Sequence, residues 1–465
     1  MFRIGAKLFR AARIGGSTVS DFRLPPTRFF SINNNVNTGF KTNPVALQMI
    51  NYAISLARAQ KSDESYAQAQ LVLEQCHSTQ LDESAKGLVF LAMSTLFSER
   101  GNFSEAIEKL QKIQDLGLSS LAVRVAASEA LTGLYLESYQ DDFSSATADM
   151  CLQLLETIRL EIGGGGSDIL EARAKALKGL VELVHGNVES AQSFFEGAQG
   201  DKGCFGNVAL SFGEFLHCKR NFQMARELYQ RAMQDVSERK DFTDSQSVSA
   251  CNMNLEETLL GATCALGQLE AHLGNFDDAE EILTAALKKA EECFGNYHPK
   301  VGIILTCIAL MYQHKAAMER SSSLLIQEGL YRRAIEVLKA PPLEVEGVGA
   351  TRSRRDILAL ARECFVMLSM VVCHDFFTSI IYVSVCFDML FLEPRIYWKQ
   401  PLKAGRGGYA ETLIVQQNRK AEGEKMKQWA ETAWTNRRLS LAEALESSES
   451  STKVSVIDTR ISRVL

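Results

Sequence analysis

The chain is poor in proline and lacks the sequence motifs of common catalytic sites. Only 8 prolines occur among 465 residues. Most segments are filled by Ala, Leu, Glu, Lys, Gln and Arg, which lose little rotamer freedom in a helix. No metalloprotease HExxH, nucleophile-elbow GxSxG, dinucleotide-binding GxGxxG after a strand, or zinc-spaced Cys/His set is present. The composition predicts an all-α fold, and the missing motifs predict a protein that is not an enzyme and needs no metal or cofactor.

Acidic residues outnumber basic ones outside the first thirty residues. The formal net charge is -6, but residues 1–30 hold six basic residues and one acidic residue, so the remainder carries -11. Affinity for phosphate backbones comes from lysine and arginine. A chain this acidic is a poor general binder of nucleic acid, so we expect no nucleic-acid partner.

Cysteine is neither paired nor spaced as in oxidised proteins. The eleven cysteines are odd in number, scattered, and form no CxxC motif. Free cysteine usually behaves as a small core residue. This usage indicates an internal, reducing compartment.

The first thirty residues are typical of a mitochondrial transit peptide. They are rich in arginine, carry serines and are nearly free of acids, and Phe2, Ile4 and Leu8 fall near one helix face. No continuous apolar core of a secretory signal is present. Arg28 precedes an aromatic–serine junction, which places the predicted cut after Phe30. The alternative is a disordered basic tail. We expect a mitochondrial protein, in the matrix, with residues 31–43 as a linker.

Five segments share one pattern, in which a helical run is followed by a Gly-Asn or similar turn, an aromatic residue and a second helix with an alanine at a fixed distance. Two of them read "MSTLFSERGNFSEAIEKLQKI" and "LGQLEAHLGNFDDAEEILTAAL". The turn residue supplies the left-handed conformation that ends the first helix. The alanine lets two helix backbones approach. One such hairpin cannot bury its face alone, so neighbouring hairpins must stack.

This pattern resembles the tetratricopeptide repeat (TPR), a family of antiparallel helix pairs stacked into a superhelix. The post-turn positions are Tyr66, Phe103, Phe143, Val188, Phe222, Phe276 and Tyr331. Only Val188 and Phe222 are separated by 34 residues, the usual TPR length, so the array should be irregular. The segment from Gly295 to Tyr312 is also similar to the repeats of kinesin light chains. The resemblance implies an all-α solenoid over residues 44–361, beginning at Pro44.

The resemblance further implies that first helices line a concave face that binds a protein or peptide. The inward slots include Thr95, Ser98, Glu99, Glu214, His217, Gln268, His272 and Gln313. The lysine and asparagine clamp of chaperone-binding family members is absent from these slots. The face is predicted to be mildly polar and acidic, which suits a basic or amphipathic peptide or a folded partner. For each histidine taken alone, a solvated or packed side chain is the alternative.

The run 364–392 contains no lysine or arginine and approaches the length of a membrane span. His374, Asp375 and Asp388 interrupt it, and charged side chains are costly at bilayer depth. We predict an atypical apolar insertion over 362–406, with a buried or interfacial helix and a transmembrane anchor as alternatives. Membrane association through this run is therefore not the favoured prediction. After it we expect a C-terminal capping helix over 407–446 and a disordered Ser/Glu-rich tail over 447–465.

The function expected from these observations is that of a non-catalytic adaptor or scaffold in mitochondria. The first alternative is an assembly factor for a respiratory complex, associated with the inner membrane, which needs the apolar run to anchor or dock. The second is an RNA-binding helical repeat protein, which would require a basic concave face.

Overall fold

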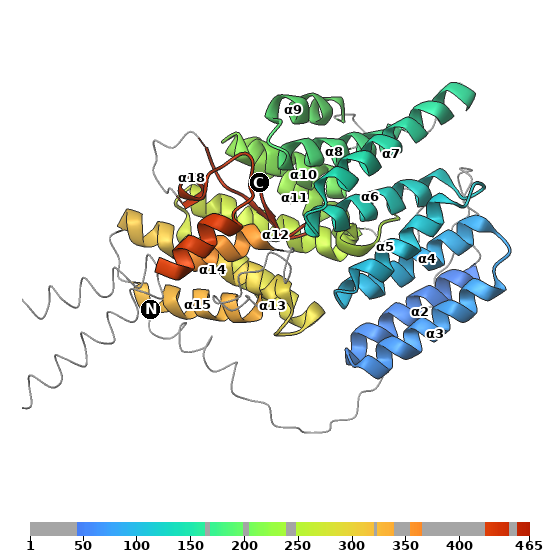
Figure 1. Ribbon diagram of the computed structural model, residues 1–465, viewed down its shortest axis with the longest axis horizontal. Helices are drawn as coiled ribbons and strands as arrows, with labels where there is room; N and C mark the ends of the chain where they lie inside the picture. Colours follow the sequence, from blue (N-terminus) through green and yellow to red (C-terminus); the bar gives the residue numbers. More distant parts are fainter. Residues whose placement is uncertain are drawn as a thin grey trace, which may run out of the picture. The chain divides into compact units, whose positions relative to one another are not determined.

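Helices account for most of the chain that the computed structural model describes, namely residues 44–162, 168–198, 204–238, 248–319, 323–338, 354–364, 424–445 and 453–465. In chain order they are α2 (Pro44–Gln60), α3 (Asp63–Thr79), α4 (Glu83–Glu99), α5 (Phe103–Gln114), α6 (Leu121–Glu137), α7 (Asp141–Ile162), α8 (Asp168–Val184), α9 (Val188–Gly197), α10 (Gly206–Cys218), α11 (Phe222–Glu238), η1 (Cys251–Met253), α12 (Leu255–His272), α13 (Phe276–Phe294), α14 (Pro299–Glu319), α15 (Leu324–Val337) and α18 (Leu441–Leu445). Residues 355–364 and 424–433 are also helical. The predicted all-α class is confirmed (Figure 1).

The turns between paired helices have the geometry that the sequence predicted. Gly101, Gly186 and Gly274 adopt φ of 76°, 81° and 81°, the left-handed region that glycine enters at low cost. At the first of these turns the N–H of Asn102 donates to the carbonyl of Phe97 at 2.9 Å, which satisfies a helix-end carbonyl. The second helices α5, α9, α11 and α13 begin at the predicted post-turn residues.

Within each pair, small residues allow the two helices to approach closely. A Cβ placed on Gly213 of α10 would lie 2.7 Å from the ring of Tyr229 on α11, and one on Gly267 of α12 would lie 2.6 Å from Leu283 on α13. The alanines of the second helices, such as Ala225, are fully buried. The large side chain of one helix therefore occupies the space that the glycine of the other leaves empty.

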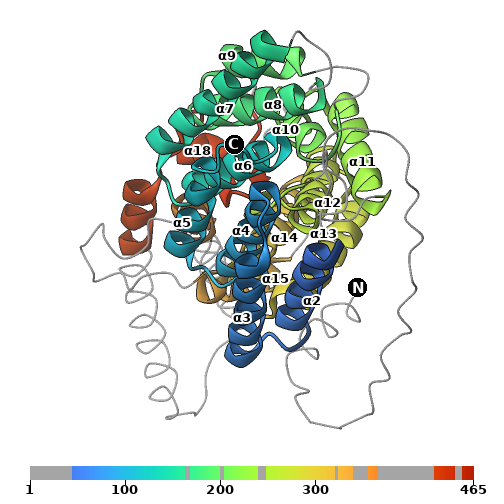
Figure 2. The same cartoon turned by 90° about the vertical axis from the view of Figure 1, so that its right-hand side faces the viewer.

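The paired helices form two layers. The first helices α2, α4, α6, α8, α10, α12 and α14 each contact the next first helix, and we call this row the inner layer. Each of the second helices α3, α5, α7, α9, α11 and α13 contacts the first helix before it and the first helix after it. This succession is visible in Figures 1 and 2. All described residues belong to one compact unit, Thr42–Leu465.

The C-terminal capping helix predicted over 407–446 is wrong in its described part, which is interrupted. Helical residues end at 433, and α18 starts only at Leu441. The carbonyl oxygen of the Asn436 side chain accepts hydrogen bonds from the N–H groups of Arg438 and Leu439 at 2.9 and 2.7 Å. Such local side-chain bonds offer the backbone an alternative to the helix. Asn436 therefore accounts for a turn where helix propensity predicted continuity.

The prediction of a disordered tail is wrong for residues 453–465. Strands β1 (Ile457–Asp458) and β2 (Arg463–Val464) form an antiparallel hairpin with Ile457 opposite Val464. Every residue from Val456 to Leu465 is at most 2% exposed. The Ser/Glu-rich composition is confined to the preceding segment, and five of these last ten residues are apolar. We call residues 456–465 the C-terminal hairpin.

Several predictions from the sequence lie outside the described residues. They are the transit peptide and linker over 1–43, and the part of the apolar run that follows Cys364. Among the described helices, one, α14, is long and apolar enough to cross a membrane by length and composition. More than half of its apolar window is buried against the rest of the fold. Its hydrophobicity is therefore explained by its place in the inner layer.

Candidate functional site

The C-terminal hairpin lies against the inner layer, where it contacts α6, α10, α12 and α14. In Figures 1 and 2 the C-terminus is seen beside α6 and α10. Val456, Ile461 and Leu465 join the hydrophobic core that α8, α10 and α12 build. We call the surface beneath the hairpin the inner groove.

Arg460 is the central polar residue of the hairpin, and its side chain is fully buried. Its Nη2 donates to Glu214 Oε2 at 2.6 Å and to Asp458 Oδ2 at 2.8 Å. Its Nη1 donates to Asn207 Oδ1 at 2.8 Å, and Nη2 also donates to Ser211 Oγ at 3.1 Å. Burial raises the pKa of Glu214 well above its ordinary value, although the Arg460 guanidinium acts in the opposite direction. The arginine is thus held by partners from the hairpin and from α10.

Two further inner-layer side chains bind the main chain of the hairpin. Gln268 on α12 donates to the carbonyl of Ile457 at 2.9 Å and accepts from its N–H at 2.8 Å. Lys300 on α14 donates to the carbonyls of Thr459 and Arg460 at 2.5 and 2.8 Å. These bonds satisfy backbone groups that the two-residue strands leave unpaired.

Three histidines form a row on the first helices that carry the groove. His217 Nε2 and His272 Nδ1 lie 2.9 Å apart, and the rings of His272 and His314 have centroids 5.3 Å apart. Burial lowers the pKa of His217 to about 3, of His314 to about 4, and of His272 well below its ordinary value. The row is neutral at physiological pH.

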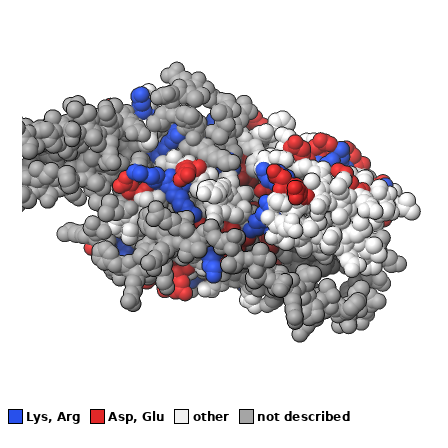
Figure 3. All heavy atoms as spheres, turned by 90° about the horizontal axis from the view of Figure 1, so that it is seen from below, with Lys and Arg blue, Asp and Glu red and all other residues white. Residues whose placement is uncertain are grey.

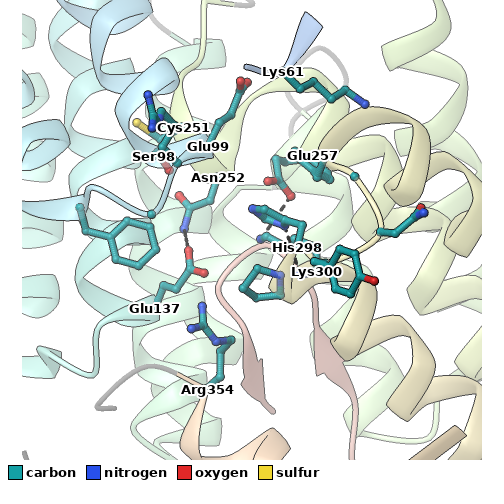
Figure 4. A pocket seen from close by; sticks show the side chains of 18 residues that line it. Lys61, Ser98, Glu99, Glu137, Cys251, Asn252, Glu257, His298, Lys300 and Arg354 are labelled. Atoms are coloured by element: carbon teal, nitrogen blue, oxygen red, sulfur yellow. Dashed lines mark hydrogen bonds and ion pairs between the residues drawn. The ribbon is translucent and has the colours of Figure 1, made fainter. Parts of the chain in front are cut away.

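Beside the groove lies an open cleft of about 600 Å³, shown in Figure 4. Its walls come from the ends of α4 and α6, from η1, from the start of α12 and from the turn between α13 and α14. The lining includes Ser98, Glu99, Arg100, Phe103, Glu137, Cys251, Asn252, Glu257, Phe294, Tyr297, His298, Lys300, Arg354 and Lys61. Figure 4 shows Glu99 and Asn252 on one side and Glu257, His298 and Lys300 on the other.

The floor of the cleft is polar and carries both signs of charge. Lys300 Nζ lies 3.2 Å from Glu257 Oε2, and Asn252 donates to Glu137 Oε2 at 3.2 Å. Burial raises the pKa of Glu257 to about 7, against the opposing effect of the Lys300 ammonium. Burial also lowers the pKa of the Arg354 guanidinium. The prediction of an acidic surface does not describe this cleft, because cationic side chains accompany its carboxylates.

The rim of the cleft is aromatic and is fixed by a tight turn. Tyr297 is 77% exposed and follows Gly295, whose φ of 91° reverses the chain after α13. The rings of Phe294 and His298 stack with centroids 4.8 Å apart on either side of the turn. Exposed aromatic residues beside a cleft are typical of protein recognition sites.

The eight predicted partner-binding residues divide among these places. Ser98 and Glu99 line the open cleft, and Glu99 is also bound by Arg58. The others are engaged inside the chain: Glu214 and Gln268 hold the hairpin, His217 and His272 contact each other, Thr95 accepts from the N–H of Cys251, and Gln313 accepts from Tyr331. His217 is completely buried, so it offers no surface to a partner. Partner contact stays a prediction; among the eight residues, Ser98 and Glu99 line the open cleft, and His272 and Gln313 are partly exposed.

The repeat pattern of the sequence does not mark Arg460, Glu137, Glu257 or Lys300. The available signal was the pair Asp458 and Arg460, which stands between Ile457 and Ile461 near residue 465. In the part of the chain that the structure describes, no three His, Cys, Asp or Glu side chains are grouped so that they could hold a metal ion. Burial raises the pKa of the Cys251 thiol in the cleft to about 12, which keeps it protonated at neutral pH.

Comparison with known proteins adds no assignment. No protein family model matches the sequence, and no curated protein matches it.

Proposed function

We propose that this protein is a non-catalytic adaptor or scaffold that binds a segment of another protein in the open cleft. The observation that carries the proposal is a cleft of about 600 Å³ at the edge of the inner layer, with a polar floor and the exposed ring of Tyr297 on its rim. Such a volume accommodates a few side chains of a polypeptide. The bound segment would bring hydrogen-bond donors and acceptors to the floor and an apolar side chain to the rim.

We further propose that the paired helices form a TPR-like solenoid. The left-handed glycines before the second helices, the glycine and large-residue contacts within pairs, and the succession of inner helices support it. In such arrays the inner layer presents the binding surface.

The charge distribution fits recognition by shape and hydrogen bonding rather than by one dominant field. Acidic and basic side chains are interspersed on the described surface that Figure 3 shows. At the cleft, Arg100 pairs with Asp63, and Arg58 contacts both Glu99 and Glu256. Electrostatic steering is therefore expected to be weak, and binding should depend only modestly on salt.

Site-specific photocrosslinking tests the proposal. A photoreactive amino acid replaces Tyr297 in one full-length variant and Leu118, which is 85% exposed and does not line the cleft, in a matched control. Both variants are expressed in cells and illuminated there. We expect a discrete protein adduct at position 297 that is absent at position 118. The same adducts at both positions, or none at 297, would contradict binding in the cleft.

The mitochondrial location is part of the proposal and rests on the arginine-rich first thirty residues. Import into isolated mitochondria tests it, with Arg3, Arg10 and Arg13 replaced by alanine in the control. We expect the wild-type chain to become protease-protected and shortened by about thirty residues. Equal protection of both chains, or of neither, would contradict the targeting role.

A further inference from the structure

The C-terminal hairpin is held in the way that proteins hold a bound peptide. Its ten residues are buried almost completely. Residues 446–455 join it to α18, and the first seven of them read ESSESST. A polar connection of this composition contributes no apolar surface of its own. The hairpin is thus a short buried segment that a polar sequence, residues 446–455, joins to α18, and we call this sequence the tether.

The inner groove contacts the main chain of the segment through side chains. The Gln268 amide pairs with both the N–H and the C=O of Ile457, as a neighbouring strand would. Lys300 binds the carbonyls of the turn. Main-chain bonds of this kind give affinity for an extended segment without reading its sequence.

Sequence selectivity comes from the turn Asp458-Thr459-Arg460. The Asp458 carboxylate accepts from the Arg460 N–H at 2.8 Å and from its guanidinium, so the segment orders its own arginine. Glu214, Ser211 and Asn207 then complete a socket around that side chain. A guanidinium is suited to such a site because its donors form a rigid fork, which an ammonium group cannot reproduce.

We propose that the inner groove is a recognition site for a turn containing Asp-x-Arg, and that residues 456–465 of the same chain are its resident ligand. This site is distinct from the open cleft and does not depend on the function proposed there. The two are neighbours, because Lys300 binds the hairpin and pairs with Glu257 in the cleft, and Glu137 accepts from Ser462 and lines the cleft. Exchange of the hairpin for an external segment would therefore alter the cleft floor.

A tether-cleavage experiment tests this proposal on the full chain. Residues 446–452 are replaced by a seven-residue protease site, and the purified protein is cut there. A synthetic peptide of residues 453–465, labelled on the partly exposed side chain of Lys453, is then added in excess. Fluorescence anisotropy follows its entry, and circular dichroism follows the helices. Peptides with Arg460→Lys and Arg460→Ala are the matched controls.

We expect the labelled wild-type peptide to replace the cut fragment while the helical signal stays unchanged. The Arg460→Ala peptide should bind at least about 100-fold more weakly, because it leaves buried carboxylates without their cation. The Arg460→Lys peptide should fall between the two. In a Glu214→Gln chain, the ratio between the wild-type and Arg460→Ala affinities should shrink by at least about tenfold.

Three results would overturn the proposal. Binding of the Arg460→Ala peptide within about threefold of the wild-type peptide would show that the groove does not select arginine. Retention of the cut fragment, with no uptake of labelled peptide over days, would show that the hairpin is a permanent part of the core. Loss of the helical signal when the fragment leaves would show the same. The peptide variants keep the comparison valid even if the Glu214→Gln chain fails to fold.

Discussion

Two spaces adjoin the inner layer, and both are lined by polar and charged side chains. One of them is filled and the other is open. The groove on α10, α12 and α14 is filled by the chain's own hairpin, whereas the cleft at α4, α6 and η1 keeps about 600 Å³ open. Glutamates of first helices line both. In the groove, Glu214 contacts a fully buried arginine; in the cleft, Glu99 faces a space beside an exposed aromatic rim.

An inward polar residue in a helical array therefore does not by itself identify an external partner. The same slot can serve stability when a segment of the chain occupies it, and binding when the space stays open. Substitutions in the two places should therefore change different measured quantities: the free energy of unfolding for the groove and the affinity for a partner for the cleft.

The largest effect is expected for Arg460→Ala. It leaves Glu214 and Asp458 buried without their guanidinium, and breaking a buried ion pair from one side costs about 3–5 kcal/mol. Urea unfolding of the full-length chain, followed by circular dichroism, measures the change. Lys453→Ala removes an exposed pair with Glu443 and should stay within about 0.5 kcal/mol. Equal urea midpoints for Arg460→Ala and Lys453→Ala would show that the buried ion pair in the groove contributes no more to stability than the exposed pair.

Gln268→Ala is expected to have a smaller effect in the same groove. The substitution leaves the N–H and C=O of Ile457 without their side-chain partners, which costs about 1–3 kcal/mol when such groups stay buried. The free energy of unfolding should fall accordingly. The control is Gln192→Ala, a partly exposed residue of α9, for which we expect less than about 0.5 kcal/mol. A neutral Gln268→Ala would mean that water replaces the amide and that the other contacts of the hairpin, such as those of Arg460 and Lys300, hold it without Gln268.

Acid should lower the free energy of unfolding through the histidine row on the helices that carry the inner groove. The folded-state pKa of His217 is about 3, so below pH 6.5 the unfolded chain takes up a proton that the folded chain does not. Stability is then lost as the pH falls. At pH 5.5 the loss from His217 alone is about 1.4 kcal/mol.

A His217→Gln variant isolates this contribution, because all other titrating groups are common to both chains. Its free energy of unfolding should change less between pH 7.5 and 5.5 than that of the wild type, by about 1.4 kcal/mol. His77→Gln is the control, since the half-buried ring of His77 should give a smaller difference. Identical pH dependence in wild type and His217→Gln would show that the buried histidine titrates normally.

Local features of the fold, such as turns and contacts within a helix pair, were predictable from the sequence. Contacts between residues far apart in the chain were not. Left-handed turns at Gly101 and Gly274 and the close contact at Gly213 follow from residue types a few positions apart. The contact between Arg460 and Glu214 joins residues 246 positions apart, and no local pattern encodes it. The Ser/Glu content of the segment before the hairpin then extended the prediction of disorder over residues that the fold buries.

The candidate site shows the same division. Ser98 and Glu99 were placed at the inner face by helical position alone, and they do line the open cleft. Glu137 and Glu257 were missed because they lie at a helix end and a helix start, outside the central slots that the repeat pattern marks. Arg460 was missed because its role exists only once the hairpin has returned to α10.

The smallest stability effect, and the sharpest contrast with the groove, is expected for Tyr297→Ala. The ring is 77% exposed, so its removal should change the free energy of unfolding by less than about 0.5 kcal/mol. If the rim contacts a partner, truncation of an aromatic anchor should cost about 2 kcal/mol of binding, or roughly 30-fold in Kd. Calorimetric titration with the protein crosslinked at position 297 measures this. Leu118→Ala should leave the affinity unchanged, and if it weakens binding as much as Tyr297→Ala does, the partner is not recognised at the cleft.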